Sequence, residues 1–126
     1  MPNSSFATAR KTMVDCQLRP SKVTDQHVLD AFMTIPREEF VGKQQRALAY
    51  VDEDLPLPGG RCLMEPMVLA RLMQALQLRP DDNLLIVGAG CGYGAAIAAS
   101  LVGSVIATET RANLVEKAQY VLVSIG

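Results

Sequence analysis

The most constraining feature of this sequence is a glycine-rich turn that follows a short apolar run. Residues 84–87 are all apolar, and in residues 88–94 every second residue is glycine. A short apolar run of this kind is typical of a strand that is buried on both faces of a parallel sheet. The alanine-rich residues 95–99 predict a closely packed helix after the turn. Strand, turn and helix together predict the first half of a nucleotide-type βαβ unit.

A second strand is expected at residues 104–108, which are rich in β-branched side chains and follow Gly103. The strand ends at Glu109, about 20 residues after the first glycine of the turn, where an acidic side chain can accept hydrogen bonds from ribose hydroxyls. A second interpretation, compatible with the first, is that Glu109 stabilises the positive end of the next helix dipole.

The glycine spacing leaves the identity of the ligand open. The dinucleotide pattern G-x-G-x-x-G/A fails when it starts at Gly88, because its last position is Tyr93. It fits when it starts at Gly90, with Gly92 and Ala95 in the other positions. NAD and S-adenosylmethionine therefore both remain possible ligands on this spacing.

Composition limits the classes of function. The 126 residues allow a single domain, with a helical and loop region at residues 1–80 and the start of the βαβ unit at residues 81–126. The net charge is −1 and the basic residues are scattered, which argues against a nucleic-acid partner. No apolar run is long enough for a membrane span. Three cysteines without a C-x-x-C pair, and His27 as the only histidine, argue against a disulfide framework and a metal site and favour the cytoplasm.

Three helices are expected before the glycine turn. Ser4 or Ser5 is predicted to cap the first, which should stop near Arg19, and Thr24 to cap the second, which should end at Pro36. Residues 44–48 suggest one more turn. Prolines and glycines in residues 52–60 predict an ordered loop or lid. The third helix should begin at Pro66, and a last helix should follow Glu109. The apolar faces predicted for the four helices are Phe6, Ala9, Met13 and Cys16; Val28, Leu29, Phe32 and Met33; Val68, Leu69, Leu72, Met73 and Leu76; and Leu114, Ala118, Val121 and Ile125.

Several segments resemble the protein-L-isoaspartate O-methyltransferase family. The likeness lies in Gln17-Leu18, in residues 28–31, in Ile35-Pro36-Arg37-Glu38-Glu39-Phe40-Val41, in residues 49–57 with their Ala-Tyr start, and in the glycine motif of residues 84–93. It runs from about Met13 to the end of the chain and is similar to the N-terminal portion of the family. The helical preamble is more specific than the glycine turn, so the resemblance favours S-adenosylmethionine over NAD.

The resemblance implies a partial Rossmann-like α/β methyltransferase fold with N-terminal helices, in which S-adenosylmethionine is the cofactor. It implies methylation of isoaspartyl carboxylates in damaged proteins, with isoaspartyl-containing proteins or peptides as substrates. The cofactor-binding residues that it implies are Gly88, Ala89, Gly90, Cys91, Gly92, Tyr93, Glu109 and Thr110.

The sequence departs from the family at two places. The family carries Gly-Gln-Thr-Ile-Ser-x-Pro before its third helix, whereas here Cys62 stands at the Thr position and Met64 at the Ser position. Ile86 replaces an acid that the family usually has two residues before the glycine turn. A catalytically impaired relative of the family is therefore the alternative interpretation. Because only two sheet strands are predicted, we also expect a truncated sheet whose open edges favour self-association.

Overall fold

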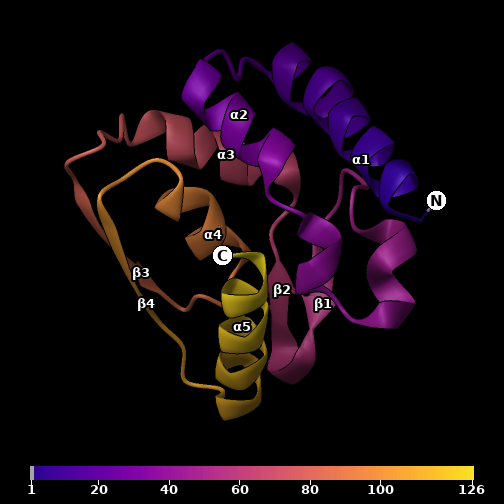
Figure 1. Cartoon of the computed structure of the whole chain (residues 1–126), viewed down its shortest axis with the longest axis vertical. Helices are drawn as coiled ribbons and strands as arrows, with labels where there is room; N and C mark the ends of the chain where they lie inside the picture. Colours follow the sequence, from indigo (N-terminus) through magenta and orange to yellow (C-terminus); the bar gives the residue numbers. More distant parts are fainter. Residues whose placement is uncertain (1) are drawn as a thin grey trace.

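The computed structural model describes residues 2–126, and Figure 1 shows its course. Three helices come first, with a small hairpin between the second and the third, and a strand–helix–strand–helix unit completes the chain. None of the helices in this described part is both long and apolar enough to cross a membrane. The elements are α1 (Pro2–Met13), α2 (Gln26–Thr34), β1 (Leu55–Leu57), β2 (Arg61–Leu63), α3 (Pro66–Ala75), β3 (Asn83–Val87), α4 (Tyr93–Ala99), β4 (Ser104–Thr108) and α5 (Ala112–Ile125), with short helical segments at Val14–Leu18, Arg19–Ser21, Arg37–Phe40 (η3), Lys43–Leu48 (η4) and Pro58–Gly60.

The first helical stretch begins earlier and ends later than the sequence predicted, and only its first part, α1, is α-helical. It begins at Pro2, so the cap expected at Ser4 or Ser5 is wrong; proline suits the first helical turn, where its missing N–H needs no partner. The chain then continues through a π-helical segment into a 3₁₀ turn that ends at Ser21, beyond the predicted stop. The wider π-helical turn changes which side of the helix faces the core, and Cys16 is exposed rather than buried.

The second helix is capped by Asp25 rather than by the predicted Thr24. The Asp25 carboxylate accepts hydrogen bonds from the backbone N–H groups of His27 (2.9 Å) and Val28 (3.4 Å). The predicted end before Pro36 is confirmed, as are the short turn at η4 and the buried face formed by Val28, Leu29 and Phe32.

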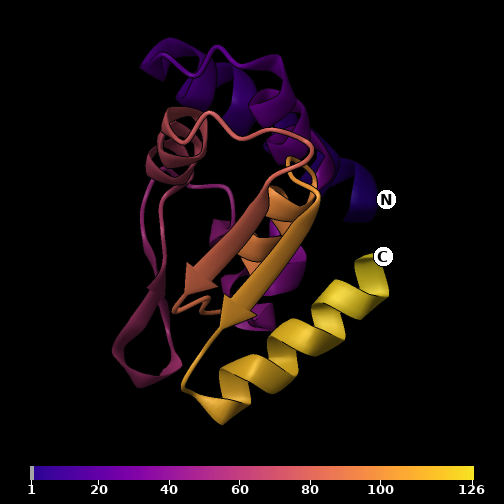
Figure 2. The ribbon, with the colours of Figure 1, turned by 90° about the vertical axis from the view of Figure 1, so that its left-hand side faces the viewer.

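The proline-rich segment predicted as a loop contains a strand, so this prediction is wrong in part. β1 and β2 pair as an antiparallel hairpin, with Leu55 opposite Leu63 and Leu57 opposite Arg61. Pro56 is tolerated there because a two-stranded ribbon leaves one edge of each strand without a partner. The hairpin turn lies at the same end of the molecule as the arrowheads of β3 and β4 (Figure 2).

The predicted βαβ unit is confirmed: β3 and β4 pair in parallel, with Leu85 opposite Ile106, and α4 connects them. The prediction that this sheet is buried on both faces is wrong. Leu85, Val87 and Ile106 are 60%, 78% and 67% exposed, while Leu84, Ile86 and Val105 on the other face pack against the core. Figure 2 looks onto the open face, and no other element of residues 2–126 lies in front of it.

One hydrophobic core joins the N-terminal helices to α4. Its centre is aromatic: the Tyr93 ring meets those of Phe32 and Phe40 edge to face, at centroid distances of 6.0 and 5.5 Å. The inward face predicted for α5 is confirmed, with Leu114 and Val121 buried.

The face predicted for α3 is only partly correct. Met73 is buried as expected, but Leu72 and Leu76 are exposed. Helix α3 contacts α2 and the Val14–Leu18 segment through one side, so only residues on that side, such as Ala70 and Met73, become buried.

Candidate functional site

The glycine turn lies at the carboxyl ends of β3 and β4, the edge of a parallel sheet at which α/β proteins bind ligands. The backbone N–H groups of Gly88 and Ala89 both donate to the Thr108 carbonyl oxygen, each at 2.8 Å. The glycine turn that follows β3 is therefore hydrogen-bonded to the end of β4. The next residue after β4 is Glu109, the predicted ribose-binding acid.

One glycine of the turn is required by packing within the protein. Gly92 has φ +91°, and a Cβ atom there would lie 3.0 Å from Cβ of Ala118 in α5. Helix α5 thus packs directly against the turn. The sequence suggested a ligand as the reason for the repeated glycines, but at Gly92 the close neighbour is a helix of the same chain.

Glu109 follows the end of β4 and lies against the glycine turn. One carboxylate oxygen, Oε1, accepts a hydrogen bond from the Gly90 N–H (2.8 Å), and Oε2 accepts one from the Arg111 N–H (3.1 Å). These backbone donors, Arg111 first, and the positive charge of Arg61 hold the pKa of Glu109 below its ordinary value. The carboxylate is therefore ionised at neutral pH and is an acceptor only.

Arg61 is the site residue that sequence reasoning missed. Its guanidinium Nη2 forms an ion pair and hydrogen bond with Glu109 Oε1, and the same nitrogen lies 2.9 Å from where a Cβ on Gly88 would be. Arg61 thus fills the space above the first glycine of the turn. No local pattern links it to an acid 48 positions away, so only the pairing of the hairpin could have indicated this contact.

The hairpin tip therefore lies over the glycine turn. Leu57, the cross-strand neighbour of Arg61, has its Cδ1 atom 3.4 Å from the Cβ position of Gly90. From the other side, Arg111 Nη2 donates a hydrogen bond to the Gly59 carbonyl oxygen at 3.2 Å. Three contacts, two of them through arginines, thus connect the hairpin to the βαβ unit.

Two predicted cofactor-binding side chains face the core. Cys91 is buried, and burial raises the pKa of its thiol. Tyr93 is fully buried; burial raises its pKa, and the Arg37 guanidinium lies 4.9 Å from its ring centroid. These two residues can offer a ligand backbone groups only. Ala89 is half-buried, and Gly88 and Thr110 are exposed.

The two residues at the family's hydroxyl positions lie in different surroundings. Cys62 is exposed and, since side chains alternate along a strand, it points to the opposite face from Arg61. Met64 is half-buried, and its carbonyl oxygen accepts a hydrogen bond from Arg37 Nη2 at 3.0 Å. A thiol is a weak donor and a thioether donates no hydrogen bond, so neither side chain replaces a hydroxyl.

A cavity of about 160 Å³ opens beside the glycine turn. Leu57 and Pro58 of the hairpin form one side, Asn113 and Lys117 of α5 another, and Cys91 part of the floor. Cys91 is the residue of the glycine turn that lines this cavity, and Glu109 is not among its lining residues.

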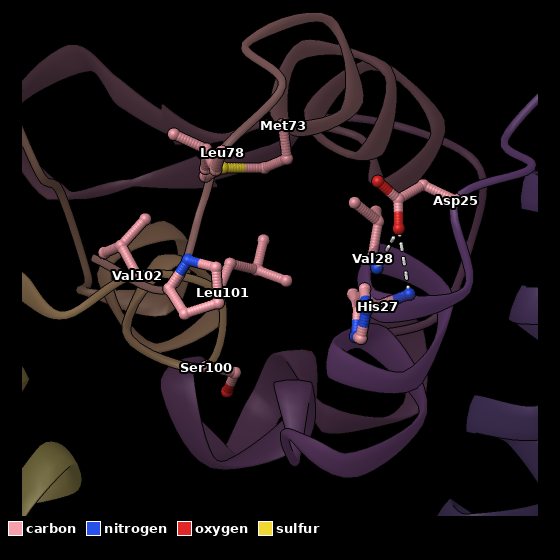
Figure 3. Close-up of a pocket in the computed structure, with 9 residues that line it drawn as sticks. Asp25, His27, Val28, Met73, Leu78, Ser100, Leu101 and Val102 are labelled. Atoms are coloured by element: carbon pink, nitrogen blue, oxygen red, sulfur yellow. Dashed lines mark hydrogen bonds between the residues drawn. The ribbon is translucent and has the colours of Figure 1, made fainter. Parts of the chain in front are cut away.

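A second cavity, of about 150 Å³, lies between α2, α3 and the end of α4 (Figure 3). Asp25, His27, Leu101 and Val102 are among the residues that line it. His27 is exposed. Because Val102 precedes β4 while the glycine turn follows β3, this cavity is at the opposite end of the sheet and does not belong to the site.

The donors and acceptors present suit a cofactor that carries a ribose. Glu109 offers two carboxylate oxygens at the glycine turn, while Arg61 and Leu57 of the hairpin cover Gly88 and Gly90. Arg61 and the Gly90 N–H both bond to Oε1, whereas Oε2 accepts a bond from the Arg111 N–H.

Comparison with known proteins agrees with these features. The family model for protein-L-isoaspartate(D-aspartate) O-methyltransferase matches residues 8–125. The protein-L-isoaspartate O-methyltransferase of Koribacter versatilis is 41% identical over 123 residues, and that of Methylorubrum extorquens is 42% identical over 125 residues. These matches cover 98% and 99% of this chain and 55% of each relative, so the chain spans about half the length of the curated relatives it matches.

Solved structures show the same fold. One protein-L-isoaspartate O-methyltransferase matches with a TM-score of 0.81 and 29% identity, over 93% of this chain and 39% of that one. A Plasmodium falciparum structure of the same description, in complex with S-adenosyl-L-homocysteine, matches with a TM-score of 0.76 and 20% identity, over 91% of this chain and 55% of that one. The family match, the βαβ unit and the acid at the glycine turn lead to one conclusion: this chain belongs to the protein-L-isoaspartate(D-aspartate) O-methyltransferase family.

Proposed function

We propose that this chain carries the S-adenosylmethionine site of a protein-L-isoaspartate O-methyltransferase, an enzyme that methylates isoaspartyl carboxylates in damaged proteins. The observation that supports it most is the contact of Glu109 with the glycine turn through the Gly90 N–H. An acid held in this position is what a ribose-binding site needs. The family match and the relatives' names support the choice of reaction.

In this proposal the backbone of Gly88, Ala89, Gly90, Cys91, Gly92 and Tyr93 lies along the cofactor, with Glu109 at the ribose and Thr110 next to it. When bound, S-adenosylmethionine supplies a methyl group on a positively charged sulfur that is a good leaving group. The acceptor carboxylate is already ionised at neutral pH. The chain therefore has to bind and orient the two partners, and it needs no general base.

The second candidate is a relative that binds the cofactor but has lost methyl transfer. Cys62 and Met64, which provide no hydroxyl donor, favour it. The half-buried Ile86, which packs against the core, favours it too, because no acid is available at that position.

Calorimetry with S-adenosyl-L-homocysteine tests the cofactor site. We expect binding by the native chain, binding at least ~10-fold weaker by Glu109→Ala, since hydrogen bonds to a charged group are lost, and unchanged binding by the exposed control Glu116→Ala. NAD titrated in parallel should give no heat. Equal binding by Glu109→Ala and the native chain would contradict the ribose assignment.

Transfer of a labelled methyl group separates the two candidates. The enzyme proposal expects label on an isoaspartyl peptide and none on the matching aspartyl peptide. Cofactor binding without any transfer, restored when Met64→Ser supplies a hydroxyl, would support the impaired relative.

Self-association through the open sheet face is the expectation for partners. Leu85, Val87 and Ile106 form an apolar surface next to strand edges that have no partner among residues 2–126. Light scattering should detect assemblies that Val87→Lys reduces; a native chain that remains monomeric at high concentration would refute this. The three free cysteines favour the cytoplasm as the compartment.

A further inference from the structure

The ion pair between Arg61 and Glu109 differs from a permanent structural contact. The Arg61 side chain is 31% exposed, whereas that of Glu109 is only 4% exposed. Glu109 also keeps backbone N–H donors on both carboxylate oxygens, from Gly90 and Arg111. Removing Arg61 would therefore leave the buried carboxylate with its fixed donors, so Arg61 is the exchangeable partner.

Arg61 and a bound ribose need the same place. Arg61 Nη2 uses the Glu109 oxygen that faces the glycine turn, and it lies 2.9 Å from the Cβ position of Gly88. A cofactor whose ribose binds Glu109 and whose body crosses the turn would collide with the guanidinium. Binding of such a cofactor consequently releases Arg61 at the edge of the site.

The released guanidinium has a defined chemical preference. It stays charged at any physiological pH, carries five N–H donors in a planar fork and binds carboxylates strongly. On β2 it faces the glycine turn, while Cys62 points to the opposite face. Among the residues that replace the family's Gln, Thr and Ser, Arg61 is thus the one able to hold an anionic group next to the cofactor site.

We propose that Arg61 is the specificity-determining residue that recognises the carboxylate of the methyl acceptor, and that Glu109 holds it until the ribose displaces it. This inference rests on the proposed function. It adds that Arg61 exchanges the carboxylate of Glu109 for the carboxylate of the methyl acceptor. Binding of the cofactor then prepares the acceptor site, so the acceptor binds after the cofactor.

The bonding in the transfer step fits this role. The acceptor oxygen forms a new bond to the methyl carbon while the bond from that carbon to sulfur breaks, and the electron pair of the broken bond stays on sulfur. No proton is transferred. Arg61 needs only to hold the second carboxylate oxygen, which leaves the first free to attack.

Calorimetry on the full 126-residue chain can test the exchange without measuring turnover. The ligands are S-adenosyl-L-homocysteine, an isoaspartyl peptide, and the same peptide with its acceptor carboxylate converted to a neutral amide. For the native chain we expect S-adenosyl-L-homocysteine to strengthen binding of the isoaspartyl peptide at least ~10-fold and to leave binding of the amide peptide unchanged.

The Arg61→Gln variant introduces the residue that the family carries at this position. We expect it to bind S-adenosyl-L-homocysteine more tightly than the native chain, because Glu109 is no longer occupied. Its affinity for the isoaspartyl peptide in the presence of that compound should fall about 10- to 100-fold. Arg61→Lys should retain part of the peptide affinity, and the exposed control Arg71→Gln should behave like the native chain.

The outcomes distinguish the inference from the proposed function. If no form of the chain binds S-adenosyl-L-homocysteine, both are overturned. If the compound binds but Arg61→Gln leaves its affinity and the peptide affinity unchanged, only the role of Arg61 is overturned. If Arg61→Gln binds S-adenosyl-L-homocysteine more tightly and no longer distinguishes the isoaspartyl peptide from the amide peptide, the proposed exchange of Arg61 between Glu109 and the acceptor carboxylate is supported.

Discussion

Replacement of Gly92 by alanine tests the conclusion that α5, rather than a ligand, requires this glycine. The backbone at Gly92 has φ +91°, and the added methyl group would lie 3.0 Å from Cβ of Ala118 and 3.6 Å from its Cα. Neither atom belongs to the flexible end of a side chain. The new methyl group can therefore be accommodated only if α5 moves away from the turn.

The size of the effect follows from two contributions. A non-glycine residue in the left-handed region costs about 1–2 kcal/mol, and forced contacts in a packed interior cost about 1–3 kcal/mol more. Gly92→Ala should thus lower the free energy of unfolding by about 2–5 kcal/mol. Gly60→Ala, at φ +77° with no atom within 4 Å, should lose only the first contribution, about 1–2 kcal/mol. Gly42→Ala, at φ −65° with open surroundings, should be neutral or slightly stabilising.

Urea denaturation of the three variants and the native chain, followed by circular dichroism, measures these differences. All should show similar m-values, so that the midpoints can be compared directly. Equal losses for Gly92→Ala and Gly60→Ala would mean that Ala118 yields without cost, which would refute the packing argument. A large loss for Gly42→Ala would show that positive φ is not what separates the sites.

Three further predictions concern the site and the N-terminal region. Gly94→Ala should stabilise the chain by up to ~1 kcal/mol, measured by urea denaturation, because its methyl group meets Leu69 at an ordinary 3.8 Å within a helix. The lowered pKa of Glu109 means that this carboxylate stabilises the folded state above the ordinary value of 4.5, and that the contribution is lost as pH falls through the lower folded-state pKa. Stability measured from pH 7 to pH 3 should therefore fall less for Glu109→Gln than for the native chain. Tyr50→Phe should cost about 1–3 kcal/mol of unfolding free energy, because the buried hydroxyl donates a hydrogen bond to Glu38 (2.6 Å) and accepts one from Arg10 (2.9 Å). Burial and the hydrogen bond to Glu38 raise the pKa of Tyr50 to about 12. The stability difference between Tyr50→Phe and the native chain should therefore be the same at pH 6 and at pH 9.

The sequence was sufficient for the βαβ unit because each of its signals is local. The apolar run before Gly88, the glycine turn and the acid at residue 109 lie within one short stretch, and their spacing follows from strand and helix lengths. The face of α5 was predictable for the same reason, since helical periodicity identifies Leu114 and Val121 without knowledge of their partners.

The failed predictions concern features that depend on distant parts of the chain. An apolar strand is compatible with burial on two faces, yet the pattern does not say whether anything covers Leu85 and Val87. The prolines of the hairpin predict a loop because they are unfavourable for a strand in a larger sheet, although a two-stranded ribbon tolerates them. The partner of Arg61 lies 48 positions away, so no periodicity reveals the contact.

Arg37 and Arg61 make side-chain contacts at opposite ends of β2, and they differ in how easily these contacts can break. This difference determines which end of the hairpin can move away from the glycine turn. Arg37 is fully buried and donates to the carbonyl oxygens of Ala49 and Met64, so releasing it would leave a charge in the core without its partners. Arg61 is part-exposed, and Glu109 keeps its backbone donors from Gly90 and Arg111 without it, so exchanging Glu109 for water or another anion costs less than releasing Arg37. The hairpin should therefore separate from the glycine turn at its tip while the Met64 end stays fixed. Hydrogen exchange that is fast near Gly59 and slow near Met64, and that becomes faster near Gly59 in Arg61→Gln, would support this hinge; uniform exchange along the hairpin would contradict it.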